Sequence, residues 1–153
     1  MRRRLRALRA LSPRDAGLLV EAWIALLGAD VGLRLWGLRR VQAWAAAGCL
    51  TRPRLGEDGA WDRIKSVQRW VGAAAHRHLL PMTCLRRGLA TQWLLGRRGI
   101  RTELRFGVRR DAGRLAAHAW LEYRGMPVGE AEAVEERFAL LVAQGESRTG
   151  AAP

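Results

Sequence analysis

The hydrophobic pattern of this chain changes its period at Ile100. Before that point apolar residues recur every three or four positions, which is typical of helices. After it Thr102, Leu104, Phe106 and Val108 alternate with charged residues or glycine, which predicts a strand with one buried face. We therefore expect an α+β fold in which helices come first and a small antiparallel sheet follows.

The first predicted helix belongs to the most apolar part of the chain. Ser12 suits the N-cap, with Pro13 at the first helical position and Asp15 three residues after the cap. From Leu18 to Leu27 the helix is apolar on nearly all sides, and a second helical piece is expected from about Val31 to Ala47. Such a helix must be buried against something, so we expect it to pack on the rest of the chain.

A membrane is the other environment that suits an apolar helix. The stretch from Gly17 to Trp36 is long enough to span a bilayer, but Glu21, Asp30 and Arg34 are costly inside one. We therefore expect a cytoplasmic protein with peripheral membrane contact at most. The apolar residues from Leu18 to Leu27 are also a candidate docking surface for a partner protein.

Loop-forming residues divide the chain into three predicted parts. These are an N-terminal helical subdomain over residues 1–58, a core over residues 59–144 and a polar tail over residues 145–153. Asp58 is expected to cap the first helix of the core. One buried stripe of that helix is predicted from apolar residues at alternating spacings of three and four: Ala60, Ile64, Val67, Val71, Ala74 and His78.

The net charge of +13 comes from 27 basic and 14 acidic residues, and Lys65 is the only lysine. Such a surface favours acidic partners of several kinds. A nucleic-acid-binding module is the less favoured alternative, because the arginines are scattered and no helix-turn-helix, RNA-binding or finger motif accompanies them. We therefore predict no nucleic-acid partner.

The cysteines and histidines do not form a metal-binding pattern. Cys49 and Cys84 are too few for a disulfide framework, which fits a reduced, cytoplasmic setting. His76 and His78 are two positions apart, so on a helix they point in different directions, and no cluster of Cys or His completes a zinc site. We predict no metal and no cofactor.

Cys84 is the candidate nucleophile. Thr83 can cap a helix that begins at Cys84 and ends near Gly99. A sulfur at that position lies near unpaired backbone N–H groups and the positive end of the helix dipole, both of which stabilise a thiolate. A small buried cysteine at a helix end is the alternative, and the choice depends on which residues lie beside it.

Three strands and a closing helix are expected after the change of period. The first strand ends at a turn over residues 111–113, and the second runs from Leu115 to Glu122. After a turn at residues 123–125, a short third strand runs from Met126 to Glu130. The closing helix is predicted from four apolar residues: Val134, Phe138, Leu141 and Val142.

His118 on the second strand is the candidate general base. If the turn at residues 123–125 is a three-residue loop, His118 lies opposite Glu130, whose carboxylate can fix the tautomer of the imidazole. The other ring nitrogen is then available to take a proton from a thiol. A two-residue loop would instead place Ala119 opposite Glu130, and Glu122 is the fallback acid.

Several blocks of this sequence resemble one known family. They are Cys-Leu-Arg-Arg-Gly-Leu-Ala at residues 84–90, Leu-Leu-Gly-Arg-Arg-Gly-Ile at residues 94–100 and, above all, Ala-His-Ala-Trp at residues 117–120. Together they are similar to the transglutaminase-like leader peptidases of lasso-peptide biosynthesis. The resemblance implies a transglutaminase/papain-like core in which the nucleophile helix packs on a small antiparallel sheet.

The resemblance also implies a function. Cys84, His118 and Glu130 would form a Cys-His-Glu triad that cuts the leader from a ribosomally made precursor peptide. It implies the split form of the enzyme, in which a separate small recognition protein holds the leader and an ATP-dependent cyclase takes the freed core peptide to form a macrolactam. A transglutaminase-like acyltransferase that uses the same residues is the alternative.

Overall fold

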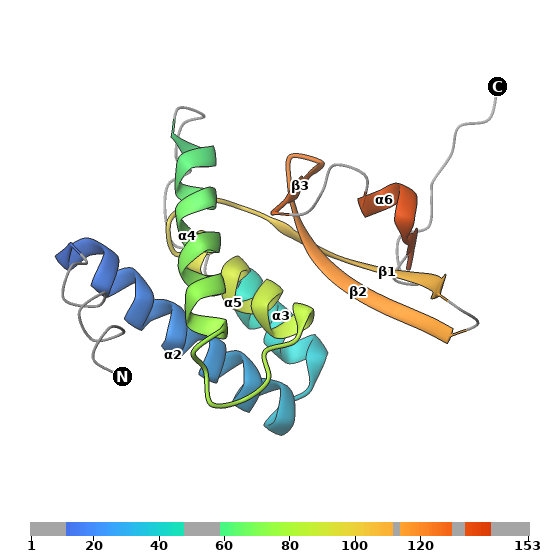
Figure 1. Ribbon diagram of the computed structural model, residues 1–153, viewed down its shortest axis with the longest axis horizontal. Coiled ribbons are helices and arrows are strands. Elements are labelled where there is room, and N and C mark those ends of the chain that lie inside the picture. Colours follow the sequence, from blue (N-terminus) through green and yellow to red (C-terminus); the bar gives the residue numbers. More distant parts are fainter. Residues whose placement is uncertain (1–11, 48–58, 112–113, 130–133, 142–153) are drawn as a thin grey trace.

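The computed structural model describes residues 12–47, 59–111, 114–129 and 134–141. Over these residues the predicted α+β order is confirmed, with helices followed by a small antiparallel sheet (Figure 1). The helices are α2 (Pro13–Leu35), α3 (Leu38–Ala47), α4 (Ala60–Ala75), α5 (Cys84–Gly96) and α6 (Val134–Arg137). The strands are β1 (Glu103–Asp111), β2 (Arg114–Tyr123), β3 (Met126–Val128) and β4 (Ala139–Leu140).

The sheet has the order β3-β2-β1-β4, and every neighbouring pair is antiparallel. Helices α2 to α5 gather on one side of the molecule, and the long β1–β2 hairpin extends away from them (Figure 1). Helix α5 contacts α2, α3 and α4 and also β2, so it joins the helical part to the sheet. The element that begins with Cys84 is therefore held on several sides.

The helices and the sheet share one hydrophobic core. The stripe predicted on α4 is confirmed from Ala60 to Ala74, since its five apolar residues are all at most 3% exposed. Leu26 of α2 and Leu94 of α5 meet this stripe, and Leu121 and Val128 join it from the sheet. Core packing thus fixes the position of α5 relative to β2.

Helix α2 is buried on one side only. Ala22, Leu26 and Ala29 are fully buried, and α2 packs on α4 and α5. On the other side Ile24 is 56% exposed and Leu35 is 68% exposed. The expectation of an apolar helix packed on the chain is therefore correct for half of its surface. By length and composition α2 could cross a membrane, but its buried side belongs to the core.

The helix ends agree with the sequence in part. Ser12 is the N-cap of α2 as predicted, and its Oγ accepts a hydrogen bond from the Asp15 N–H at 3.2 Å. Gly59, with φ of 87°, is the N-cap of α4, so the prediction of Asp58 is wrong. Helix α4 ends at Ala75, which leaves His78 beyond it. The domain boundaries after residues 58 and 144 stay predictions.

The structure decides one open question about the sheet and corrects one prediction. Tyr123 pairs with Met126, so the loop between β2 and β3 has two residues, Arg124 and Gly125, rather than three. Both residues have positive φ, 53° and 75°, which is the twist that two-residue hairpin loops favour. The predicted closing helix is only the four-residue α6, and the chain then forms β4, which pairs with β1.

Candidate active site

Cys84 is the first residue of α5, as predicted, and it is partly exposed. Thr83 is the N-cap residue in extended conformation, but its side chain makes no capping hydrogen bond. The expectation that its hydroxyl caps the helix is therefore wrong. As a consequence the Thr83 hydroxyl does not occupy the N–H groups of the first turn, which remain next to the Cys84 side chain.

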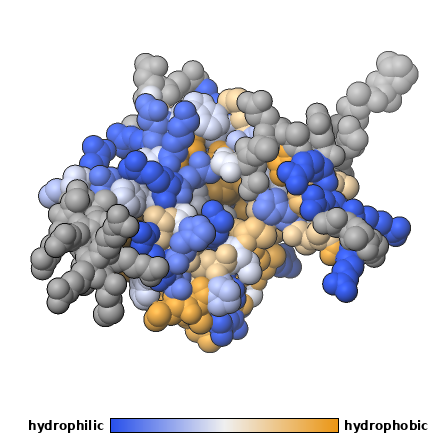
Figure 2. Space-filling model, viewed as in Figure 1, coloured by the Kyte–Doolittle hydropathy of each residue, from blue (hydrophilic) through white to orange (hydrophobic). Residues whose placement is uncertain are grey.

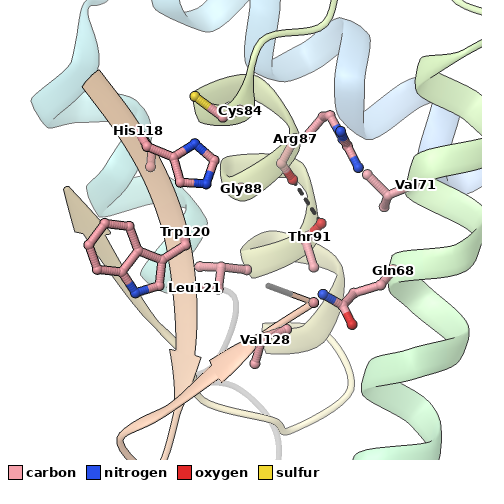
Figure 3. A pocket seen from close by; sticks show the side chains of 12 residues that line it. Gln68, Val71, Cys84, Arg87, Gly88, Thr91, His118, Trp120, Leu121 and Val128 are labelled. Atoms are coloured by element: carbon pink, nitrogen blue, oxygen red, sulfur yellow. Dashed lines mark hydrogen bonds between the residues drawn. The ribbon is translucent and has the colours of Figure 1, made fainter. Parts of the chain in front are cut away.

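His118 lies in the middle of β2, where it pairs with Gly107 of β1. Cys84 and His118 line the same cavity, which has a volume of about 100 Å³. Figure 3 shows the imidazole beside the start of α5, on the side where the sulfur of Cys84 projects. The structure thus brings together the predicted nucleophile and base, which are contributed by the helical part and by the sheet.

Two aromatic rings lie against His118. The ring centroids of His118 and Trp120 are 6.2 Å apart with an interplanar angle of 20°, and that of Phe138 is 5.2 Å from His118. A Cβ added to Gly107 would lie 2.7 Å from Cβ of Phe138 and 2.9 Å from Cζ3 of Trp120. The glycine therefore leaves the space in which both rings pack beside the histidine.

Glu122, the fallback acid, is engaged with other groups. Its side chain is buried, and its Oε1 accepts a hydrogen bond from Nε1 of Trp120 at 3.1 Å. Its Oε2 accepts one from Nε of Arg105 at 3.0 Å. Glu122 therefore fixes the indole that packs against His118, which is a positioning contact that the sequence did not suggest.

Glu130 lies outside the described residues, so its predicted place opposite His118 stays a prediction. The argument from a three-residue loop no longer supports it, because the β2–β3 loop has two residues. Gly129, the residue before Glu130, does line the cavity with Cys84 and His118. The chain therefore reaches the cavity immediately before the candidate acid.

The far end of the cavity is polar. Gln68 of α4 and Thr91 of α5 line it, and the Thr91 hydroxyl donates a hydrogen bond to the Arg87 carbonyl at 2.8 Å (Figure 3). Gly129 has φ of 75°, a conformation that favours glycine, and a Cβ there would displace the side-chain amide of Gln68. Helical periodicity alone could not show that Gln68 faces the cavity.

A buried ion pair holds the start of α5 against α2. Asp30, whose side chain is 3% exposed, pairs with Arg86 at 2.7 Å and with Arg34 at 3.0 Å. Arg86 also donates a hydrogen bond to the Pro81 carbonyl at 2.8 Å. Arg86 is thus a structural ion-pair partner, whereas the next residue, Arg87, is exposed at the rim of the cavity.

Among the residues that the structure describes, no three His, Cys, Asp or Glu side chains are grouped so that they could hold a metal ion. His78 instead stacks on Trp23 with ring centroids 4.7 Å apart, and its Nδ1 accepts a hydrogen bond from the Leu80 N–H. Cys49 lies outside the described residues. Among the described residues that line the cavity, Cys84 supplies a thiol and His118 an imidazole.

Comparison with known proteins gave one match. The family model described as "Transglutaminase-like superfamily" matches residues 25–143, from the middle of α2 to beyond β4. No curated protein and no solved structure matches the chain. The matched region contains Cys84 and His118, the two candidate catalytic residues that line the cavity.

Proposed function

Because this chain belongs to the transglutaminase-like superfamily, we propose that it is a cysteine peptidase with Cys84 as nucleophile and His118 as base. The superfamily supports a cysteine peptidase or an acyltransferase activity. The observation that carries the proposal is that Cys84 at the start of α5 and His118 on β2 line one cavity. A thiol beside a general base is suited to acyl transfer through a thioester, and the helix start further favours the thiolate.

The reaction follows from these two groups. His118 takes the proton of the Cys84 thiol, and the thiolate attacks the carbonyl carbon of the scissile peptide bond. As the bond breaks, His118 gives the proton to the departing amine, and an acyl-enzyme thioester remains. A water molecule, deprotonated by His118, then releases the acid and restores the thiol. The backbone N–H of Cys84 is our candidate donor to the oxyanion.

The third member of the proposed triad is Glu130. Its support is the family resemblance and the position of Gly129 on the wall of the cavity. Glu122 is less suited to the role, because Trp120 and Arg105 use both of its carboxylate oxygens. In this proposal Glu130 orients the imidazole and stabilises its charged form without taking part in bond making.

The proposed substrate is the precursor of a lasso peptide, cut at the end of its leader before the macrolactam forms. Support comes from the Ala-His-Ala-Trp block at residues 117–120, of which His118, Ala119 and Trp120 line the cavity. We propose that the protein acts in the cytoplasm with a separate leader-recognition protein and passes the core peptide to an ATP-dependent cyclase. The recognition protein would raise the local concentration of the scissile bond.

Mass spectrometry of a precursor peptide after incubation with the protein tests the chemistry. Hydrolysis gives two fragments whose masses sum to that of the precursor plus water, whereas acyl transfer to an added amine gives an adduct. We expect Cys84→Ala and His118→Ala to abolish cleavage, and Cys49→Ala to retain it. Cleavage at the wild-type rate by Cys84→Ala would refute the cysteine-peptidase proposal, and adducts without hydrolysis would favour the acyltransferase.

The split system is tested by kinetics. We expect slow cleavage by this protein alone and a large increase on addition of the recognition protein. If the leader or its carrier is acidic, part of that increase should weaken as salt rises, because ions screen the attraction to a chain of net charge +13. Full activity of the chain alone would contradict the need for a partner.

A further inference from the structure

The outer side of α2 carries a continuous apolar stripe, which we call the outer stripe. Val20, Ile24, Val31 and Leu35 are 58%, 56%, 40% and 68% exposed, and Leu27 is half-buried between them. Their spacing of three and four places them on one side of the helix. The opposite side of α2 packs on α4 and α5, so the outer stripe faces away from the core.

Exposed tryptophans extend the outer stripe at its C-terminal end. Trp36 is 59% exposed and Trp44 of α3 is 43% exposed. Both rings line an apolar groove of about 230 Å³, together with Gly28 and Val41. Figure 2 shows hydrophobic side chains gathered at the lower edge of the view, where the C-terminal half of α2 and the loop between α4 and α5 overlap in Figure 1.

The charges around the outer stripe are basic. Arg34, Arg39 and Arg40 are exposed next to it. The acidic residues of α2 are all paired with arginines: Asp15 with Arg69, Glu21 with Arg98, and Asp30 with Arg34 and Arg86. The sequence before α2 adds five arginines before residue 10 and no acidic residue.

We propose that the outer stripe docks on an anionic membrane surface, with α2 lying parallel to the membrane plane. Aliphatic residues on one side of a helix, flanked by arginines and ending in tryptophans, match the chemistry of the boundary between acyl chains and acidic headgroups. A helix that spans the bilayer is excluded, since Ala22, Leu26 and Ala29 are needed in the core.

Other occupants fit less well. A second copy of this chain would bring together two molecules of net charge +13, with arginines beside the contact. A protein partner could receive such a helix side in a groove, but the outer stripe, about 24 Å long over its 16 residues at 1.5 Å per residue, is flanked by arginines and ends in exposed tryptophans. Outside the groove at Trp36 the outer stripe is straight, and a straight apolar stripe suits the fluid boundary of a membrane.

In the docked orientation the candidate active site stays open to solvent. The cavity lies between α4, α5 and the sheet, on the side of α2 opposite to the outer stripe. Membrane docking would thus hold the protein at the surface without blocking access of a peptide to Cys84. The proposal does not depend on the peptidase activity.

Vesicle flotation of the full chain tests the docking. The probes are vesicles of phosphatidylcholine alone and vesicles of phosphatidylcholine with one third phosphatidylglycerol. We expect the protein to float with the anionic vesicles only, less so at high salt. The double variant Ile24→Glu, Leu35→Glu should lower vesicle affinity by about tenfold or more, because two carboxylates would then enter the apolar boundary.

The matched control is the double variant Leu79→Glu, Leu115→Glu. It makes the same change of residue and of charge at leucines that are 89% and 74% exposed and lie outside the outer stripe. This control and Cys84→Ala should bind vesicles as the wild type does. Failure of the wild type to float, or equal loss in both double variants, would overturn the proposal. Loss of stimulation by the recognition protein in the stripe variant, without vesicle binding by the wild type, would assign the stripe to a protein partner instead.

Discussion

The substitution Gly107→Ala tests how the aromatic rings hold His118. The new methyl group would lie 2.7 Å from Cβ of Phe138 and 2.9 Å from Cζ3 of Trp120, whereas carbon atoms in contact are normally about 3.5–4.0 Å apart. Trp120 is 2% exposed, so its ring cannot move freely into solvent. One or both rings must therefore move by roughly 1 Å to restore a normal contact distance.

The expected cost combines two opposing effects. Overpacking of a filled core typically costs about 1–3 kcal/mol. Replacement of glycine by alanine recovers about 0.4–1 kcal/mol by restricting the unfolded chain, since Gly107 does not have positive φ and alanine can adopt its backbone conformation. We therefore expect the free energy of unfolding to fall by about 1–2 kcal/mol. Leader cleavage should slow as well, because the displaced rings contact the proposed base.

Urea unfolding and leader cleavage should be measured on the same preparation of Gly107→Ala. Gly17→Ala is the control, because it lies in α2 and a Cβ there meets nothing within 4 Å. The control should be more stable than wild type by about 0.5–1 kcal/mol, as expected for an exposed helical glycine, and equally active. A Gly107→Ala protein with wild-type stability and cleavage would refute the argument that this glycine makes room for the rings beside His118.

Three further predictions concern the residues around the cavity. Arg86→Met should lower the free energy of unfolding by about 3 kcal/mol, because it leaves the buried Asp30 carboxylate with Arg34 alone. The control Arg110→Met, at an exposed site, should change the free energy of unfolding by less than about 0.5 kcal/mol. Glu122→Gln should lower the free energy of unfolding by about 1–3 kcal/mol, since an amide offers one acceptor oxygen to two donors. If Glu122 acts through Trp120, the losses of stability in Glu122→Gln and Trp120→Phe should not add in a double-mutant cycle, and additive losses would contradict that coupling. Glu130→Gln should lower the turnover rate but leave measurable cleavage, and a larger loss in Glu122→Gln would identify Glu122 as the third member of the triad.

The sequence predicts those features of the fold that depend on local periodicity. The stripe of α4 follows from the spacing of apolar residues and the start of α5 at Cys84 from the break that ends at Thr83, and the structure confirms both. On β2 the burial does not alternate, because every residue from Ala119 to Tyr123 is buried. The sequence leaves the length of the β2–β3 loop open, because two-residue and three-residue loops both suit Arg124-Gly125, and one residue of difference turns every later side chain to the other face.

Contacts between distant segments were beyond prediction. The position of Asp30 beside Arg86 depends on how α2 crosses α5, and the contact between Gln68 and Gly129 depends on how α4 approaches β3. Neither of these packing arrangements can be predicted from the spacing of apolar residues along the chain. The same limit applies to α2: an apolar helix predicts burial, but the residues of its outer stripe are apolar without being covered.

Cys84 and His118 belong to different parts of the fold, and this has a consequence for the newly made protein. The proposed nucleophile belongs to the helical part and the proposed base to the sheet, and they are 34 residues apart in the sequence. During synthesis the thiol therefore leaves the ribosome before the imidazole that would activate it. Until β2 has docked on α5, the chain holds a cysteine without its base, so proteolytic competence would be acquired only when the folded sheet is in place.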